Sequence, residues 1–213
     1  LLDELSPEAQ LIGAVNTVLN DNGKLIGYNT DGYGFMQSVR DAGHDITGKN
    51  ITVMGVGGAS MAICAQSALD GAASVHIFAR RTSRYWNRTQ KFAENLSAKT
   101  GCQVCLFDND DHTALRDSIA QSYLLINATS VGMVPDIDDT IIKDTSLFHP
   151  ELVVADVVYE PQETRLLREA KAAGCQTFNG MYMLLHQGAK AFQIWTGQEM
   201  PVSVIKEKYF SVK

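Results

Sequence analysis

The feature that most constrains the fold is a regular alternation, from about residue 50 onward, of short β-branched runs with longer helical patterns. Such alternation is typical of βαβ units that build a parallel sheet. The segments predicted to be strands are 51–55, 74–79, 102–107, 123–127, 152–157 and 176–178. The segments with helical spacing between them are 59–70, 89–99, 113–121 and 163–173. We therefore predict an α/β fold with a doubly wound parallel sheet.

The residues before this alternation have a different pattern. Two apolar runs, 14–19 and 24–28, flank the turn sequence Asn20-Asp21-Asn22-Gly23, which predicts a β-hairpin. Residues 32–42 then have the pattern of a helix that ends at Gly43.

The two ends of the chain carry their own signals. Residues 183–196 predict a helix rich in Leu, Ala, Phe and Trp, and a second helical stretch follows Pro201 as far as Phe210. We expect this pair to pack back on the hairpin. At the other end the chain opens without Met and immediately enters Ser6-Pro7, an N-cap followed by a first-turn proline, so we expect the sequence to begin within a fold.

Bulk properties exclude several classes of protein. The net charge of −6 offers no broad cationic surface for a nucleic acid. The sequence has no apolar run of about eighteen residues and its start has no signal-peptide pattern, so we expect a cytoplasmic protein without a membrane segment. The four cysteines are Cys64, Cys102, Cys105 and Cys175. Cys102 and Cys105 fit C-x-x-C but lie in a predicted strand, where residues three apart face opposite sides, so we predict free thiols and no metal site.

A glycine-rich loop is the most informative local motif. Gly55, Gly57, Gly58 and Ala59 stand between the first predicted strand of the sheet and the helix that follows it. Glycines at such a turn let backbone amides approach a pyrophosphate at the positive end of the helix. Ser60 occupies the position where the strict dinucleotide motif has its third glycine. The strand, loop and helix together predict a Rossmann-like NAD(P)-binding domain.

The residues after the second strand of the sheet bear on the choice of cofactor. An enzyme that uses NAD usually presents an acid there, but this chain has Arg80, Arg81, Thr82 and Arg84. Arginine can clamp a 2′-phosphate, so we predict NADP as the favoured cofactor, with NAD as the alternative. The alternative is that these arginines bind no ligand and are solvated charges at a helix start.

Six ordered motifs, taken together, resemble the shikimate dehydrogenase family. They are 12–18, 28–32, 57–59, 127–133, 156–161 and 180–197. Residues 78–81 and 175–180 look more like the quinate/shikimate branch of the family. The resemblance implies an oxidoreductase of the shikimate pathway, which leads to chorismate and aromatic amino acids. It would interconvert shikimate and 3-dehydroshikimate, with quinate and 3-dehydroquinate as a further pair.

The resemblance also assigns residues to the substrate site. Asp31 matches the aspartate of a catalytic Lys-Asp pair and also a substrate-binding residue, and Asn16, Tyr159 and Gln187 match further substrate-binding residues. Amide side chains suit a polyol because each offers donors and an acceptor. Each residue also has a purely structural alternative. Asn16 and Asp31 could stabilise a turn or cap a helix, Gln187 could hydrogen-bond to the backbone, and Tyr159 could be a packing residue.

On the cofactor side, the resemblance implies contacts near the nicotinamide. Thr129 and Ser130 follow a strand at the edge where ligands bind, and Val157 and Gly180 lie in two later motifs. Val157 and Tyr182 differ from the commoner family residues, and we expect them to alter the packing of the nicotinamide.

The resemblance also points to what the sequence lacks. The family's Ser-x-Ser carboxylate clamp and its catalytic lysine lie upstream of the first matching motif. Lys24 flanks the hairpin turn and Lys49 precedes the first strand of the sheet, so neither is a substitute. We therefore expect this chain to bind cofactor with little or no turnover. Two alternatives stay open: a non-enzymatic NAD(P)-binding sensor or scaffold, and a related dehydrogenase such as a folate-linked one.

These observations together predict a division of the chain. Residues 1–47 would be the C-terminal part of a substrate domain, and residues 48–180 the NAD(P)-binding domain. Residues 181–213 would be helices that return to the partial α/β substrate domain. The expected partner is a small-molecule substrate, and the sequence carries no signal for an oligomeric state.

Overall fold

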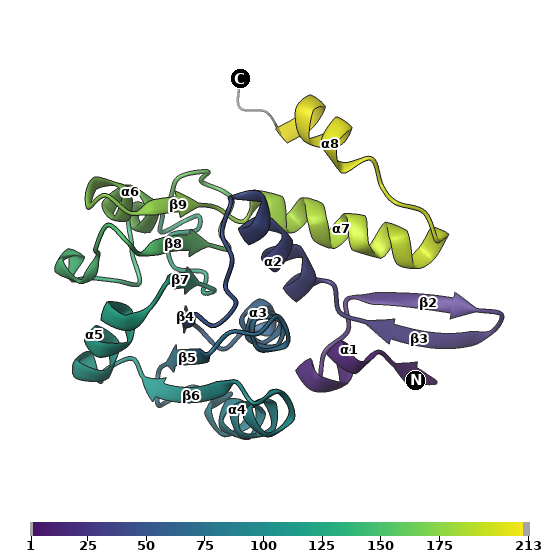
Figure 1. Ribbon diagram of the computed structural model, residues 1–213, viewed down its shortest axis with the longest axis horizontal. Helices are drawn as coiled ribbons and strands as arrows, with labels where there is room; N and C mark the ends of the chain where they lie inside the picture. Colours follow the sequence, from purple (N-terminus) through teal and green to yellow (C-terminus); the bar gives the residue numbers. More distant parts are fainter. Residues whose placement is uncertain (1, 211–213) are drawn as a thin grey trace.

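A six-stranded parallel sheet forms the centre of the computed structural model, which describes residues 2–210 (Figure 1). Its strands are β4 (Asn50–Met54), β5 (Ser74–Ala79), β6 (Gln103–Asp108), β7 (Leu124–Asn127), β8 (Val153–Asp156) and β9 (Gln176–Phe178). They lie in the order β6-β5-β4-β7-β8-β9, and every neighbouring pair is parallel. The chain starts at the centre, winds to one edge and then returns to wind to the other. This is the predicted doubly wound sheet, and its strand order changes direction between β4 and β7.

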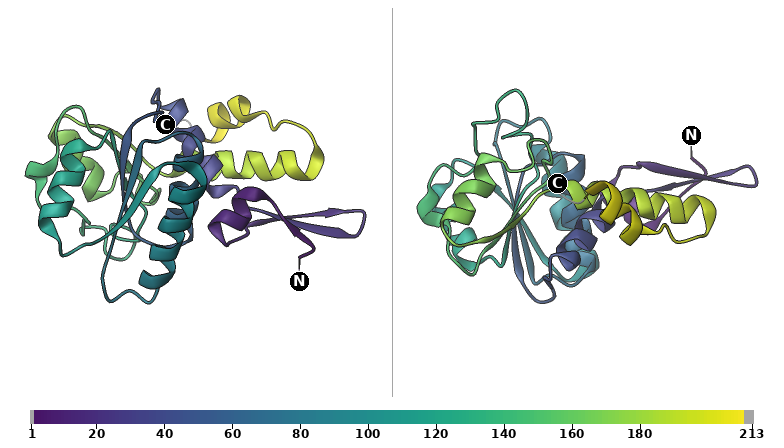
Figure 2. Two further views of the ribbon diagram at one scale, coloured as in Figure 1. Left: turned by 60° about the horizontal axis from the view of Figure 1, so that its bottom comes forward. Right: turned by 90° about the horizontal axis from the view of Figure 1, so that it is seen from above.

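Helices cover both faces of this sheet, as the two views of Figure 2 show. They are α3 (Gly58–Leu69) and α4 (Trp86–Thr100), with α5 (His112–Gln121), α6 (Arg165–Ala172) and the short 3-10 helix η1 (Thr145–Leu147). One buried core joins the sheet to α3 and α4, and a second joins its other face to α5 and α6. The predicted strands and helices of this region agree with the observed ones to within three residues at either end.

A smaller sheet of three strands lies beside the large one. It consists of β1 (Glu4–Leu5), β2 (Thr17–Asp21) and β3 (Lys24–Tyr28), in the order β1-β3-β2. The predicted hairpin is present, but its turn is only Asn22-Gly23, at φ 52° and 96°, which fits a type I′ turn. The prediction that the first hairpin strand begins at residue 14 was wrong. That strand begins at Thr17, because residues 14–16 bend toward the segment after β3, where Asn29 Nδ2 donates to the Ala14 carbonyl.

Two further elements of this region bear on the sequence predictions. Helix α1 (Pro7–Ile12) begins where Ser6 and Pro7 predicted a helix start, and the Ser6 hydroxyl accepts from the Ala9 amide at 3.2 Å. Strand β1, which pairs in parallel with β3, was not predicted, because two residues are too short to show an alternation.

The helices α2 (Asp31–Asp41) and α7 (Met181–Thr196) connect the two sheets. A Cβ added at Gly34 of α2 would lie 2.7 Å from both the Met183 carbonyl oxygen and the Gln187 nitrogen, so glycine is required for this close crossing. At the far end of α7, Trp195 Nε1 donates to the Val18 carbonyl of β2 at 2.9 Å. The division at residues 47/48 and 180/181 stays a prediction.

The last described residues do not form the single second helix that the pattern up to Phe210 predicted. They form the short helix α8 (Val202–Ile205), followed by a π-helical turn, η2 (Lys206–Phe210). Lys206 donates to Asp41 of α2 at 3.1 Å, which ties this end of the chain to the rest of the fold. None of the helices within residues 2–210 is long and apolar enough to cross a membrane.

Candidate dinucleotide and substrate site

A groove of about 880 Å³ runs along the carboxyl ends of the strands at the centre of the large sheet. It lies where the strand order changes direction, which is the usual ligand position in open α/β sheets. Its lining residues are Gly55, Val56, Gly57, Phe78, Ala79, Arg80, Thr82, Ser83, Arg84, Tyr85, Asn109, Ala128, Thr129, Ser130, Val131 and Ile141. Among these described residues none is acidic.

The glycine loop forms the floor of this groove. Gly55 has φ 111°, and a Cβ there would lie 2.9 Å from the Ala128 carbonyl oxygen, so the loop needs glycine at this point. Ser60, which replaces the third glycine of the motif, is buried and donates to the Gly55 carbonyl at 2.6 Å, closing the loop from beneath. Helix α3 has Gly57 as its N-cap and no side-chain cap, so the amides of its first turn are open to an anion.

The structure divides the predicted loop residues between several positions. Gly55 and Gly57 line the groove, whereas Gly58 lines a smaller cavity of about 160 Å³ on the side of α1. Ala59 packs against the core beneath the loop.

The arginine-rich loop after β5 forms one end of the groove. Arg80, Thr82 and Arg84 line it, and the Arg84 guanidinium lies 4.7 Å from the centre of the Tyr85 ring. Arg81 does not line the groove, because its guanidinium lies over the Trp86 ring at 4.6 Å. The cationic end of the groove is therefore formed by Arg80 and Arg84.

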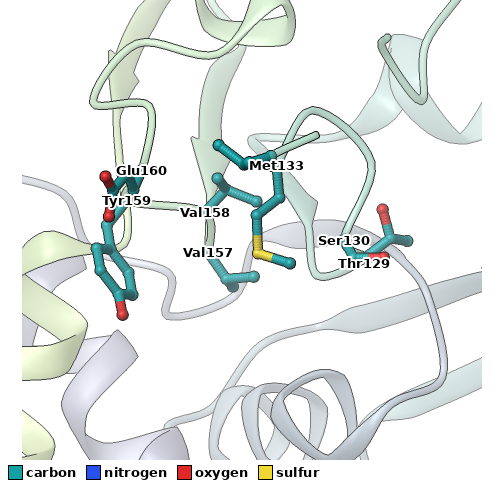
Figure 3. A pocket seen from close by; sticks show the side chains of 8 residues that line it. Thr129, Ser130, Met133, Val157, Val158, Tyr159 and Glu160 are labelled. Atoms are coloured by element: carbon teal, nitrogen blue, oxygen red, sulfur yellow. The ribbon is translucent and has the colours of Figure 1, made fainter. Parts of the chain in front are cut away.

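A second cavity of about 500 Å³ adjoins the opposite end of the groove (Figure 3). Its lining residues are Thr129, Ser130, Met133, Val134, Val157, Val158, Tyr159 and Glu160. Thr129 and Ser130 line both spaces, so the two adjoin at these residues. Gly180 stands behind this cavity, where an added Cβ would lie 2.0 Å from the Val157 carbonyl oxygen. The lining is more apolar than that of the arginine end.

Asn16 and Asp31 form a hydrogen-bonded pair at the start of α2. Asn16 Nδ2 donates to Asp31 Oδ1 at 2.9 Å and to the Thr30 hydroxyl at 3.1 Å. Asn16 Oδ1 accepts from the Thr30 amide at 3.0 Å, which fixes the orientation of its side chain. Burial raises the pKa of Asp31, and the hydrogen bond from Asn16 opposes that shift. The pair can present an amide and a carboxyl group to a hydroxylated ligand.

Gln187 and Tyr159 come from two other elements. Gln187 is half-buried where α7 crosses α2. It lies against Gly34, which is one helical turn after Asp31 in α2. Tyr159 is 43% exposed at the second cavity, on the loop after β8. Within residues 2–210 no hydrogen bond joins either side chain to the Asn16–Asp31 pair. The structure thus brings two of the four predicted substrate residues into direct contact.

Several lining residues were not predicted from the sequence. Asn109 directly follows β6, and its place after a predicted strand of a parallel sheet was a usable signal. Ile141 comes from a long irregular loop and carries no local signal. Neither Lys24 nor Lys49 lines the groove: Lys24 pairs with Glu4 at the small sheet, and Lys49 lies 5.4 Å from the centre of the Tyr123 ring.

The cysteines have the environments of structural thiols. Cys64, Cys102 and Cys175 are buried and Cys105 is half-buried, and all four are free. Burial raises the pKa of Cys64 to about 12 and that of Cys102 to about 11. Thiols with such raised pKa values are poor nucleophiles at neutral pH.

Comparison with known proteins relates this architecture to one family. The family model "Shikimate 5'-dehydrogenase C-terminal domain" matches residues 180–208. A shikimate dehydrogenase (NADP(+)) of Listeria innocua is 53% identical over 209 residues, which are 98% of this chain and 72% of that protein. A quinate/shikimate dehydrogenase of Escherichia coli O139:H28 is 42% identical over 206 residues, which are 97% of this chain and 71% of that protein.

A solved structure gives the same result in three dimensions. Shikimate 5-dehydrogenase from Listeria monocytogenes, in complex with shikimate and NAD, superposes with a TM-score of 0.93 at 52% identity. The superposition covers 97% of this chain and 71% of that one. The alignment with these relatives covers almost the whole chain, and the backbone superposes on that of the solved structure. The chain therefore belongs to the shikimate dehydrogenase family.

Proposed function

We propose that the protein is an NADP-dependent oxidoreductase that interconverts shikimate and 3-dehydroshikimate in the biosynthesis of chorismate and aromatic amino acids. The observation that carries this proposal is a groove with a cationic end at Arg80 and Arg84, together with the Asn16–Asp31 pair at the start of α2. A relative at 53% identity is named shikimate dehydrogenase (NADP(+)), which supports the same cofactor.

The residues of the groove fit NADP. The uncapped start of α3 suits a pyrophosphate, and Arg80 and Arg84 suit a 2′-phosphate that no lining carboxylate would repel. The more apolar cavity with Thr129 and Val157 suits the nicotinamide ring. When bound there, NADP would accept or supply the hydride of the reaction.

The substrate residues fit a carboxylated polyol. Asn16 and Gln187 each offer donors and an acceptor to ring hydroxyls. We propose that Asp31 binds substrate and acts with a proton-transferring lysine, as the family resemblance implies. Burial raises the pKa of this carboxyl group, which favours its protonated form compared with that of an exposed aspartate. Tyr159, exposed beside the second cavity, would contact the substrate from the nicotinamide side.

Neither Lys24 nor Lys49 is a candidate for the lysine of this pair, because Lys24 pairs with Glu4 and Lys49 lies over the ring of Tyr123. The resemblance places the lysine upstream of Asn16. A positioned acid or base typically contributes about 10²- to 10⁴-fold to a rate, so we expect turnover to depend on that lysine as well as on Asp31.

The finer features of the proposal concern substrate range and location. Quinate and 3-dehydroquinate are the second substrate pair, because a relative at 42% identity is named quinate/shikimate dehydrogenase. We propose a cytoplasmic location, which the four free cysteines support because reducing compartments keep thiols unpaired. The expected ligands are small molecules, and the net charge of −6 argues against a nucleic-acid partner.

Two measurements test the proposal. Calorimetric titration of the 213-residue chain should show NADP binding at least about tenfold more tightly than NAD, because a charge-assisted contact adds roughly 1.5–3 kcal/mol. The variant with Arg80→Ala and Arg84→Ala should lose this preference while it still binds NAD. Equal affinities of the unmodified chain for both dinucleotides would contradict the assignment of NADP.

The second measurement follows NADPH oxidation with 3-dehydroshikimate and, separately, with 3-dehydroquinate. We expect oxidation of NADPH with 3-dehydroshikimate and a loss of rate of about 10²-fold or more in Asp31→Asn. An unchanged rate in Asp31→Asn would contradict the role of Asp31.

A further inference from the structure

A carboxylate that the proposed reaction does not use lies at the end of β8. Asp156 is fully buried. Its Oδ1 accepts from Asn127 Nδ2 at 3.0 Å and from the Val158 amide at 2.9 Å, and its Oδ2 accepts from the Thr164 hydroxyl at 2.8 Å. No ion pair to Asp156 occurs within residues 2–210. Three neutral donors, drawn from three segments of the chain, thus converge on one carboxylate.

The first donor, Asn127, is hydrogen-bonded to the turn that forms one wall of the apolar cavity. Asn127 ends β7, and its Nδ2 also donates to the Val131 carbonyl at 3.1 Å. Its Oδ1 accepts from the Thr129 amide at 3.1 Å and from the Thr129 hydroxyl at 2.6 Å. The turn from Thr129 to Val131 is therefore attached to the Asn127 amide, whose orientation Asp156 fixes.

The second donor controls the opposite wall. Val158 follows β8, and its backbone amide is bonded directly to Asp156. Val157, Val158 and Tyr159 line the cavity across from Thr129 and Ser130, with Met133 above them in Figure 3. The Val158 carbonyl accepts from the Gly180 amide at 3.3 Å, so this wall also reaches the start of α7.

The third donor, the Thr164 hydroxyl, bonds to the other carboxylate oxygen, Oδ2. Thr164 is buried and is the N-cap of α6, where its hydroxyl oxygen also accepts from the Leu167 amide at 3.4 Å. Burial raises the pKa of Asp156, and the bonds from Val158, Thr164 and Asn127 oppose that shift. The carboxylate oxygen at Oδ1 is the shared point between the two walls.

We propose that Asp156 is a positioning residue for the nicotinamide end of the dinucleotide. By accepting from Asn127 and from Val158 at a single oxygen, it sets the spacing between the Thr129–Val131 turn and the Val157–Tyr159 turn. This inference rests on the proposed function, since it assumes that the nicotinamide occupies the cavity between these turns. The arginine end of the groove is not attached to Asp156 by any of these bonds.

The test compares two ligands that differ in whether they reach this cavity. NADPH extends from the arginine end to the cavity, whereas 2′,5′-ADP carries only the adenine half and the 2′-phosphate. In Asp156→Ala the Asn127 amide, the Val158 amide and the Thr164 hydroxyl lose their bonds to the carboxylate, and we expect NADPH to bind about tenfold more weakly. The affinity for 2′,5′-ADP should change by less than about twofold.

Two further variants separate positioning from loss of the fold. Asp156→Asn keeps an oxygen that can accept from Asn127 and Val158, so it should restore most of the affinity for NADPH. Thr164→Val removes only the third donor, keeps the shape of the side chain, and should weaken NADPH binding about threefold with 2′,5′-ADP unaffected, which keeps the test available if Asp156→Ala does not fold. Thr52→Val is the control, because it removes a buried hydrogen bond to Ser122 elsewhere in the same sheet and should leave both affinities unchanged.

The outcomes distinguish this inference from the proposed function. Failure of the unmodified chain to bind NADPH would overturn the proposed function and this inference with it. Binding by the unmodified chain, with equal losses for both ligands in the folded Asp156 and Thr164 variants or with no loss in any of them, would overturn the positioning role alone.

Discussion

The two sheets of the molecule are stabilised in different ways. In the large sheet β7 and β8 are buried at every position, with helices on both faces (Figure 2). In the small sheet only Thr17 of β2 and Gly27 of β3 are buried, and the strands are fastened by the hairpin turn, by α1 and by a hydrogen bond from α7. The proposed cofactor groove stands on the first sheet, while Asn16 lies at the margin of the second. The proposed cofactor groove therefore stands on a sheet stabilised mainly by burial, whereas Asn16 stands beside a sheet that depends more on hydrogen bonds between segments.

The largest expected effect contrasts one leucine from each sheet. Leu125 in β7 is fully buried, and Leu125→Ala should lower the free energy of unfolding by about 3 kcal/mol, because the substitution leaves a cavity. Leu19 in β2 is only half-buried, and Leu19→Ala should cost about 1 kcal/mol. Urea unfolding followed by circular dichroism measures both. Equal losses would break the contrast between the sheets.

The second prediction concerns the loop at the carboxyl edge of the large sheet. In Gly55→Ala the new Cβ would stand at a φ of 111° and 2.9 Å from the Ala128 carbonyl oxygen, which should cost about 2 kcal/mol of stability and weaken NADP binding at least about tenfold. Gly43→Ala is the matched control. Gly43 has φ 85° with no atom within 4 Å of an added Cβ, so it should lose about 1 kcal/mol of stability and no affinity for NADP. Thermal melting and calorimetry supply the two readouts, and an affinity loss common to both variants would contradict the role of the loop.

The third prediction addresses α7, where it joins the regions. His186 of α7 is buried and its Nε2 lies 2.8 Å from Asp41 Oδ2, while Lys206 donates to the same oxygen. Burial alone would raise the pKa of Asp41, but the hydrogen bonds from His186 and Lys206 outweigh it and the pKa is lowered. His186→Phe keeps a ring in the same place, removes one donor, and should lower the free energy of unfolding at pH 7 by about 1 kcal/mol.

The sign of the pH dependence follows from the direction of the Asp41 shift. Because its folded pKa lies below the ordinary value of 3.8, the carboxylate contributes stability above that value, and the contribution is lost as the pH falls through the folded pKa. Urea midpoints of the unmodified chain and of His186→Phe should therefore converge below pH 3.8. A difference that persists unchanged at lower pH would show that packing, rather than the bond to Asp41, accounts for the loss.

The smallest effect is expected at the contact between α7 and the small sheet. Trp195→Phe removes the hydrogen bond to the Val18 carbonyl, and because the side chain is 57% exposed the cost should be only about 0.5 kcal/mol. Hydrogen exchange should accelerate about twofold in the amides of β2 and β3 and stay unchanged in β4 and β7. Acceleration that spread equally to the large sheet would mean that the two regions open together.

The sequence predicted the large sheet well because its signals are local. Each strand is a short apolar run, each helix has its own period, and Ser6 and the Asn22-Gly23 turn act within a few residues. The strand β1 escaped prediction because its stability comes from pairing with β3, some twenty residues away. The late π-helical turn at Lys206–Phe210 was read as a plain helix, since the local periods of the two are similar over one turn.

The site was less predictable, because it depends on which side chains turn toward the groove. Arg80 and Arg81 look equivalent in the sequence, yet only Arg80 lines the groove, since the Trp86 ring holds the guanidinium of Arg81. The contact of Asn16 with Asp31 requires β2 and the segment after β3 to end side by side. The convergence on Asp156 likewise requires parallel strands in register, which no local pattern reveals. Whether Tyr159 and Gln187 reach the same ligand stays a prediction.

The two tryptophans of the chain give each region its own optical reporter. Trp86 is 7% exposed beneath Arg81, close to the arginine end of the groove, whereas Trp195 is largely open to water against the small sheet. Their emission should therefore separate into a blue-shifted component and a red-shifted one. In Trp195→Phe the remaining fluorescence would follow events at the groove alone, and in Trp86→Phe it would follow the junction of α7 with β2. A single chain, excited at one wavelength, could thus show whether its two halves respond to a ligand together or in sequence.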